Sequence, residues 1–188
     1  MAEVVIGASG AHFAVNALAV LSAVGALGAD VVQASASLEK WSPVGGRGAR
    51  DKITLPDGIL ELIDDSYNAN PVSVGASLGV LAACEGRKIA VLGDMKELGD
   101  TGPDLHAGLA ALDVSKEIDQ FHTVGPLMAY LAEALPPEKR GLHKETSAEM
   151  AAAIPAELRA GDVVMVKGSL SMGLRQVVDA IRNMGQGD

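Results

Sequence analysis

The side chains best suited to chemistry lie in one polar segment of eight residues, Asp64–Pro71, which reads Asp-Asp-Ser-Tyr-Asn-Ala-Asn-Pro. Adjacent side chains of an extended chain point to opposite sides, so we do not expect Asp64 and Asp65 to act as an acid–base pair. A single carboxylate there is suited to accept hydrogen bonds from ribose hydroxyls or to lie near a Mg²⁺-nucleotide. A structural alternative stays open, in which the segment caps the following helix with Ser66 or Asn70 as N-cap.

Two further polar groups follow apolar runs. Residues 93–99 read Gly-Asp-Met-Lys-Glu-Leu-Gly, and Lys167 ends the run 162–167, with Ser169 soon after it. Ligands of open parallel sheets bind beyond the carboxyl ends of the strands. A lysine that ends a buried strand would extend its ammonium there toward an anion, although an ordinary strand end and turn is the alternative. His106 lies in the next helix and is placed to face the same crevice.

A polar pair interrupts the apolar helix predicted over residues 12–28. His12 and Asn16 are four residues apart and therefore share one helix face. Such a pair requires buried backbone partners or a ligand, and the spacing alone favours a structural role. No histidine has metal-ligand spacing with a carboxylate, and the one cysteine, Cys84, excludes a Cys-rich zinc site. We therefore predict no protein-bound transition metal.

Alternating strand and helix signals must position these side chains. Strands are predicted at residues 58–63, 88–92 and 120–124, near Leu142, and at 162–167, and helices at 72–84, 105–112, 127–135, from about 147, and at 173–184. Short apolar strands that alternate with helices are typical of βαβ units. The pattern predicts an α/β fold of the Rossmann-like type, a doubly wound, mostly parallel sheet with helices on both faces.

The first fifty residues differ from the rest of the chain. They carry no net charge, so the remaining residues hold the whole net charge of −9. Two apolar helices, 12–28 and 31–40, precede a Gly-rich break at 41–50, which is the predicted domain boundary. Helices with so little polar surface pack on the rest of the chain, on another copy, or within a larger domain. The Gly-Gly-Arg-Gly loop around Arg47 is either a flexible linker or a loose phosphate-binding loop.

The composition limits the classes of function. Of 188 residues, 48% are hydrophobic and only 3% aromatic, which suits a sizeable core of aliphatic side chains. No basic stripe is present that could neutralise phosphates, so we expect no nucleic-acid partner. No uninterrupted apolar run reaches about 18 residues, and the start lacks the charged region of a secretory signal. We therefore expect no membrane span and a cytoplasmic location.

Four motifs together resemble the Mur ligase family. They are residues 64–71, residues 91–99 followed by His106, residues 166–169 with Met172, and residues 10–17 with the Pro-Val-Gly-Gly-Arg of 43–47. They run through nearly the whole chain in the family's order. The resemblance implies that residues 1–45 are the last helices of a central ATP-binding domain and that residues 46–188 are the carboxy-terminal domain.

The resemblance also implies a reaction of a longer enzyme. ATP would phosphorylate the terminal carboxylate of UDP-N-acetylmuramoyl-tripeptide, and the amine of D-alanyl-D-alanine would attack the acyl phosphate. The implied cofactors are ATP and Mg²⁺. The Mg²⁺ ligands would lie in the remaining domains of the ligase, which are implied partners of this chain.

The family's functional residues correspond to positions of this sequence motif by motif. The resemblance implies Arg47 and Lys167 as catalytic residues, with Arg47 on the γ-phosphate. It places His12 and Asn16 by the nucleotide, with Asn16 on adenine, and Asp65 on ribose. Asn68 and Asn70 would shape the same edge, whereas Asp94, His106 and Ser169, beside Lys167, would line the side where the two substrates meet.

The family's phosphate loop, which ends in Gly-Lys-Thr/Ser, does not occur in these 188 residues. Without it nothing holds the β- and γ-phosphates and their metal for in-line transfer, so we expect this stretch alone to be inactive as a ligase. Two alternatives stay open. One is a stand-alone, non-catalytic α/β module that binds a nucleotide or another ligand, and the other is a second chain that supplies the missing parts.

Overall fold

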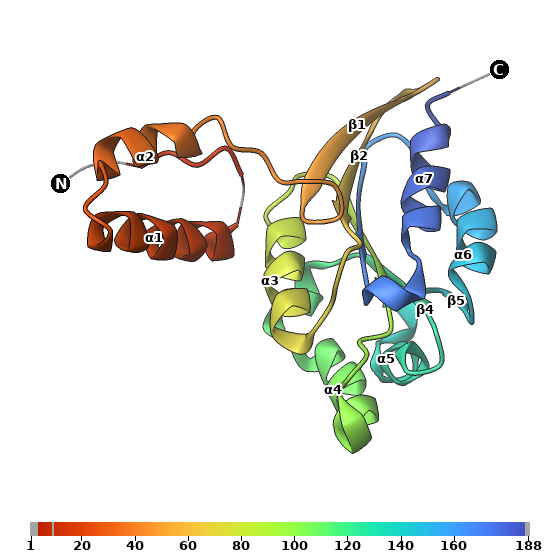
Figure 1. Ribbon diagram of the computed structural model, residues 1–188. Helices are drawn as coiled ribbons and strands as arrows, with labels where there is room; N and C mark the ends of the chain where they lie inside the picture. The colour runs from red at the N-terminus through yellow and green to blue at the C-terminus, as the bar shows by residue number, and fades with distance from the viewer. Residues whose placement is uncertain (1–3, 9, 187–188) are drawn as a thin grey trace. The chain divides into compact units, whose positions relative to one another are not determined.

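The computed structural model describes residues 4–8 and 10–186, without the side chains of Ala11 and His12. The chain divides into two compact units, one reaching to Pro43 and the other beginning at Val44 (Figure 1). The first unit is a pair of helices, and the second contains a six-stranded sheet.

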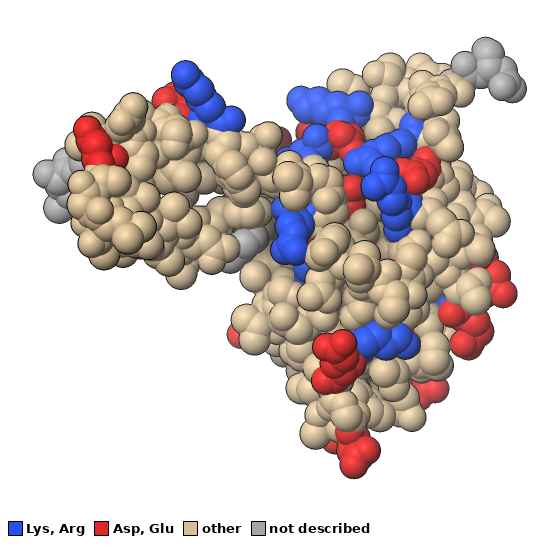
Figure 2. Space-filling model, in the orientation of Figure 1, with Lys and Arg blue, Asp and Glu red and all other residues tan. Residues whose placement is uncertain are grey.

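Helices α1 (Ala11–Ala26) and α2 (Val31–Leu38) make up the first unit, close to their predicted ranges. Asp30 caps α2, since its carboxylate accepts hydrogen bonds from the backbone of Val32 (2.8 Å) and Gln33 (3.1 Å). Figure 2 shows few charged side chains on this pair. Several apolar side chains are more than half exposed, namely Val15, Leu18, Val20, Leu27 and Val32.

A mostly parallel sheet organises the second unit. Its strands are β1 (Ala49–Leu55), β2 (Gly58–Asp65), β3 (Arg87–Gly93), β4 (Gln120–Val124), β5 (Arg140–Lys144) and β6 (Asp162–Lys167). The order is β1-β2-β6-β3-β4-β5, with β1 antiparallel to β2 and every other pair parallel. Five strands match the prediction. The remaining strand, β1, lies outside the prediction, because it is a polar edge strand in which only Ile53 is buried.

Helices cover both faces of this sheet. They are α3 (Pro71–Ala82), α4 (Gly102–Gly108), α5 (Met128–Ala134), α6 (Ser147–Ala153) and α7 (Arg175–Asn183), with 3-10 turns at Gly99–Thr101, Leu109–Ala111, Asp113–Glu117, Pro137–Lys139, Ile154–Glu157 and Leu170–Met172. The helix expected over residues 105–112 begins and ends earlier, as α4, and continues as the turn Leu109–Ala111. No helix in the described parts of the chain is long and apolar enough to cross a membrane.

Successive residues of the central strands enter two separate cores. Leu92 of β3 belongs to the core that contains Leu78 of α3, whereas Val91 belongs to the core that contains Val177 of α7. Figure 1 shows α3 and α7 on opposite sides of the sheet. Because both faces are buried, these strands are apolar at nearly every position. The predicted fold class, a mostly parallel sheet with helices on both faces, is confirmed.

Candidate functional site

The parallel strands end side by side and bring predicted site residues to one edge of the sheet. Asp65 at the end of β2 is in register with Lys167 at the end of β6, and Lys167 is in register with Leu92 of β3. Gly93, the next residue of β3, is in register with Val124 at the end of β4. The carboxyl edge is where open α/β sheets bind ligands. The polar segments that follow β2, β3 and β6 therefore lie together at this edge of the sheet.

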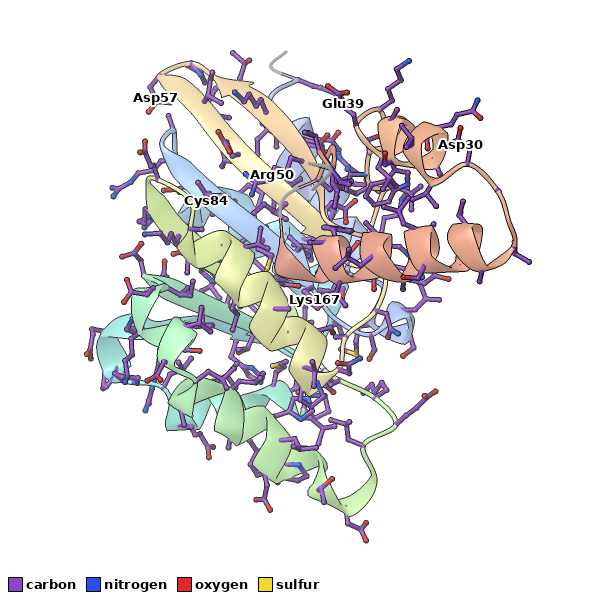
Figure 3. The ribbon with its side chains drawn as sticks, turned by 90° about the vertical axis from the view of Figure 1, so that its left-hand side faces the viewer. Asp30, Glu39, Arg50, Asp57, Cys84 and Lys167 are labelled. Atoms are coloured by element: carbon purple, nitrogen blue, oxygen red, sulfur yellow. The ribbon has the colours of Figure 1, made fainter. Side chains whose placement is uncertain are left out.

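Lys167, labelled in Figure 3, forms an ion pair with Asp65 at this edge. Its Nζ lies 2.7 Å from Asp65 Oδ2 and donates a second hydrogen bond, of 2.9 Å, to the backbone oxygen of Asn68. The Lys167 side chain is only 4% exposed, and that of Asp65 is 18% exposed. The ammonium that was expected to meet a ligand anion thus has a carboxylate partner within the chain, and it fixes the segment after β2.

Asp65 keeps one carboxylate oxygen available to a ligand. Its Oδ2 accepts hydrogen bonds from Lys167 and, at 2.6 Å, from the hydroxyl of Ser77 in α3. Its Oδ1 has no hydrogen-bond partner among the described residues. A carboxylate oxygen that is held in place and partly exposed is a suitable acceptor for a ligand hydroxyl. This geometry fits the ribose contact that the motif implies.

The two asparagines of the segment shape its turn into α3. Asn70 is the N-cap of α3, since its Oδ1 accepts from the backbone N–H of Ser73 at 2.8 Å and Ser73 Oγ accepts from the Asn70 N–H at 3.0 Å. Asn68 Oδ1 accepts from the backbone N–H of Ala69 at 2.9 Å. Capping therefore accounts for Asn70, whereas the exposed amide nitrogen of Asn68 has no partner in the described part of the chain.

Asp64 has a different role from its neighbour Asp65. Its Oδ1 accepts from the Ser66 hydroxyl at 2.6 Å, and its Oδ2 lies 3.2 Å from Arg182 of α7. Arg182 also pairs with Asp51 of β1 at 2.7 Å. Burial lowers the pKa of Arg182, but the hydrogen bonds and charges of Asp51 and Asp64 outweigh burial and raise this pKa above its ordinary value. Asp64 thus ties β2 to α7.

Asp94 is fully buried after β3 and joins three segments. Its Oδ1 accepts from the backbone N–H of Met128 in α5, and its Oδ2 pairs with Lys96, each at 2.9 Å. Its backbone oxygen accepts from the N–H of Ser169 at 3.1 Å. A Cβ at Gly125 would lie 2.6 Å from the Asp94 carboxylate, so the approach of these segments requires glycine. Asp94 therefore positions the loop after β3.

His106 and Ser169 hold the backbone of that same loop. The His106 ring is fully buried, and its Nε2 accepts from the backbone N–H of Met95 at 2.9 Å. Its Nδ1 therefore carries the proton and donates to the Gly102 oxygen at 2.6 Å. Ser169 Oγ accepts from the N–H of Lys96 at 2.9 Å. We expected both side chains to line the substrate side, but the structure buries them and uses their polar atoms to fix the loop.

Arg47 lies in a loop that is bound to the segment after β2. The Tyr67 N–H donates to the Gly46 oxygen at 2.9 Å, and the Gly48 N–H donates to the Asp64 oxygen at 2.8 Å. These bonds attach the loop to the end of β2 and to the segment that follows it. The guanidinium carbon of Arg47 is 4.2 Å from the centroid of the Tyr67 ring, and the residue is exposed. Arg47 forms no ion pair with any residue that the structure describes.

His12 and Asn16 belong to the first unit. Asn16 is exposed on α1, and the side chain of His12 lies outside what the structure describes. Their place by a nucleotide stays a prediction. Within residues 4–8 and 10–186, no three His, Cys, Asp or Glu side chains form a group that could hold a metal ion.

Two residues that shape this edge are absent from the predicted site, Ser77 and Tyr67. Ser77 carries a buried hydroxyl on an apolar helix, and such a group requires a hydrogen-bond partner. That requirement is the signal that could have identified Ser77, whose partner is Asp65. Tyr67 stands inside the polar segment, but its contact with Arg47 depends on how the Gly46 loop folds back. No sequence spacing indicates that contact.

A match to a family model shows to which family the chain belongs. The model for "Mur ligase, glutamate ligase domain" matches residues 52–170, which is more than half of the chain and contains the segments after β2, β3 and β6. The chain belongs to the Mur ligase family. The resemblance stated from the four motifs is thereby confirmed.

Curated Mur ligases are similar to nearly the whole chain. The UDP-N-acetylmuramoyl-tripeptide–D-alanyl-D-alanine ligase of Mycobacterium leprae is 33% identical across 95% of this chain, and that of Mycobacterium tuberculosis (strain CDC 1551 / Oshkosh) is 35% identical across 96%. The matched part is 38% and 39% of these relatives. This chain therefore spans about two fifths of their length.

Solved Mur ligase structures share the fold. A crystal structure of MurF from Acinetobacter baumannii superposes with a TM-score of 0.79 at 27% identity, covering 96% of this chain and 40% of that one. The MurF ligase from Thermotoga maritima, solved in complex with ADP, has a TM-score of 0.72 at 24% identity over 88% of this chain and 36% of its own. At that identity the second likeness shows the fold alone.

Proposed function

We propose that this chain is the carboxy-terminal part of an ATP-dependent ligase that joins D-alanyl-D-alanine to UDP-N-acetylmuramoyl-tripeptide in peptidoglycan synthesis. The observation that carries the proposal is the similarity to curated ligases of that name over 95% of the chain. The geometry of the carboxyl edge supports it. Arg47, which has no ion pair among the described residues, fits a phosphate, and the available Oδ1 of Asp65 fits a ribose hydroxyl.

The segment after β2 and the loop bound to it recognise the nucleotide. Asp65 Oδ1 accepts from a ribose hydroxyl, and Asn68 lies at the same edge. Arg47 binds the γ-phosphate, since a planar guanidinium can meet two phosphate oxygens at once. The motif resemblance also assigns His12 and Asn16 to the nucleotide, with Asn16 on adenine.

The loop after β3 forms the side of the site where the two substrates meet. Asp94, His106 and Ser169 act as positioning residues, because their polar atoms are engaged inside the protein and fix the loop backbone. Lys167 acts through Asp65, which it holds at the edge. These four residues thus form a support for the site and do not contact the tripeptide or the dipeptide directly.

In the proposed reaction ATP transfers its γ-phosphoryl group to the terminal carboxylate of the tripeptide. The amine of D-alanyl-D-alanine attacks the acyl carbon, loses a proton and displaces inorganic phosphate, which leaves an amide bond. The phosphate loop and the Mg²⁺ ligands come from the remaining domains, so the 188 residues alone catalyse no ligation. Because the reaction consumes ATP and a UDP-linked substrate, we expect the ligase to act in the cytoplasm.

The proposal is tested by mass spectrometry of products formed by the longer ligase that contains this chain. With ATP, Mg²⁺, UDP-N-acetylmuramoyl-tripeptide and D-alanyl-D-alanine, we expect the pentapeptide together with equal amounts of ADP and phosphate. The 188-residue chain and L-alanyl-L-alanine are the controls, and neither should support product formation. A product that forms without ATP, or only with another amine, contradicts the proposal.

A further inference from the structure

We infer that Tyr67 is a positioning residue for Arg47, whose guanidinium it holds over its ring at the carboxyl edge, ready to meet a phosphate. The inference rests on the proposed function, in which Arg47 contacts the phosphoryl group that is transferred. Nothing in the motif resemblance assigns this role to the tyrosine. It follows from the contact between the two side chains and from what surrounds them.

The contact has the geometry of a cation–π interaction. The guanidinium carbon of Arg47 lies 4.2 Å from the centroid of the Tyr67 ring. Distances within about 6 Å of the ring centroid are attractive, and a planar guanidinium stacks well on an aromatic face. Tyr67 is 43% exposed, so its ring is open to solvent beside the ligand edge.

Among the described residues neither Asp64 nor Asp65 forms an ion pair with Arg47, which leaves the Tyr67 ring as the contact of its guanidinium. Asp64 accepts from Ser66 and Arg182, and Asp65 accepts from Lys167 and Ser77. An ion pair would occupy N–H groups of the guanidinium, whereas stacking uses its face. No group that the structure describes occupies the five N–H donors of Arg47, so they are available to phosphate oxygens.

The backbone fixes the two residues relative to one another. The Tyr67 N–H donates to the Gly46 oxygen, so the tyrosine holds the loop with its backbone and the arginine with its ring. Gly46 has a φ of 81°, and a Cβ there would lie 3.1 Å from the Tyr67 Cβ. A side chain held in one orientation loses less rotamer freedom when it binds its ligand. Tyr67 thus prepares Arg47 for phosphoryl transfer.

Steady-state kinetics of the whole ligase test this role. Tyr67→Leu removes the ring, and we expect kcat to fall about fivefold while KM for ATP changes less than about twofold. Tyr67→Phe keeps an aromatic face and should retain most of the wild-type kcat. Tyr130→Leu is the matched control, because Tyr130 is equally exposed, at 45%, on α5.

A double-variant cycle separates positioning from an independent role. In an Arg47→Ala background, Tyr67→Leu should cause no further loss of kcat, because the ring then has no guanidinium to hold. An unchanged kcat for Tyr67→Leu in the wild-type background overturns the inference. So does a fivefold loss that persists in the Arg47→Ala background.

Nuclear magnetic resonance of the 188-residue chain distinguishes failure of this inference from failure of the proposed function. Ring-current effects should move the Arg47 side-chain proton signals upfield, and Tyr67→Leu should abolish the shift while Tyr67→Phe retains it. An absent shift overturns the inference, whatever the activity. If the shift is present but Arg47→Ala keeps normal turnover, the contact between Arg47 and Tyr67 exists. In that case Arg47 takes no part in phosphoryl transfer, and the proposed role of the contact is wrong.

Discussion

Lys167 Nζ lies 2.7 Å from Asp65 Oδ2, although 102 positions separate the two residues in the sequence. The pair joins the ends of β6 and β2, which are neighbours in the sheet. The lysine is nearly buried, so Asp65 and the Asn68 oxygen replace the water that its ammonium would otherwise bind. One internal ion pair therefore supports both the sheet edge and the carboxylate proposed for ribose.

Replacing Lys167 by methionine should lower the free energy of unfolding by about 2–3 kcal/mol. The side-chain volume is roughly kept, but Asp65 loses its partner in a site that is mostly closed to water. Chemical denaturation of wild type, Lys167→Met, Asp65→Asn and the double variant measures the coupling. The double variant should be more stable than Lys167→Met alone. If the two single losses simply add, the ion pair contributes nothing.

Replacing His106 by leucine should destabilise the protein by about 2 kcal/mol, because the Met95 N–H and the Gly102 oxygen lose their buried partner. His106→Gln is the matched variant, since its amide oxygen can still accept from Met95. Hydrogen exchange at the Met95 amide should accelerate in the leucine variant and stay slow in the glutamine variant. Equal protection of that amide in all three proteins would show that His106 does not hold the loop.

Gly125→Ala should be much more destabilising than Gly99→Ala. Both glycines have a positive φ, 102° and 57°, so alanine is strained at each by about 1–2 kcal/mol. Only at Gly125 does the added Cβ also meet the Asp94 carboxylate, whereas nothing lies within 4 Å at Gly99. We expect an additional loss of about 2 kcal/mol for Gly125→Ala in denaturation experiments. Similar losses at the two sites would contradict the tight approach to Asp94.

The free energy of unfolding should decrease on acidification because of His122, which is buried in β4. Burial, together with the positive charge of Arg87, lowers the pKa of His122 to about 4. In the unfolded chain this pKa is about 6.5, so between these values the unfolded chain binds a proton that the folded protein does not. The sign is therefore a loss of stability on acidification from about pH 6.5 to 4, of up to about 3 kcal/mol.

His122→Asn provides the control for that pH dependence. His122 Nδ1 accepts from the Leu142 N–H at 2.9 Å, and its buried Nε2 has no partner in the described part of the chain. Asparagine can keep the acceptor and does not titrate. Denaturation at several pH values should give a smaller slope for the variant between pH 4 and 6.5. Identical slopes would assign the acid sensitivity to other groups.

The sequence predicts the fold well where burial determines the residue types. Strands β3 and β6 are apolar because both of their faces are covered, and the helices between strands follow from the alternation. The sequence does not indicate strand β1, because an edge strand with one buried residue, Ile53, has no apolar run. Its pairing with β2 depends on register, which the pattern does not indicate.

The candidate site could be predicted in position but not in its contacts. The carboxyl ends of parallel strands place Asp65 and Lys167 at one edge, but their pairing requires that β2 and β6 be neighbours. His106 was expected in the crevice, because sequence spacing gives a helix face and not a depth. Its burial follows from the way α4 packs beneath the loop after β3, through the Met95 contact.

The measurement that tests the account most directly is the turnover of Arg47 variants of the whole ligase, normalised to folded protein. If Arg47 meets the γ-phosphate, its contact strengthens as charge develops, so Arg47→Ala should lower kcat by about 10³-fold and change KM for ATP little. Arg47→Lys should recover only part of the loss, because an ammonium cannot replace the planar fork.

Arg50 is the internal control for this measurement, three residues further on in β1. Its guanidinium lies 3.9 Å from Glu61 and 3.6 Å from the Cys84 sulfur, and Figure 3 shows Arg50 and Cys84 labelled together. Arg50→Ala should leave turnover nearly unchanged. If Arg47 meets the γ-phosphate, Arg47→Ala should lose most of its kcat and Arg50→Ala almost none. Near-normal turnover of folded Arg47→Ala protein would contradict this role of Arg47.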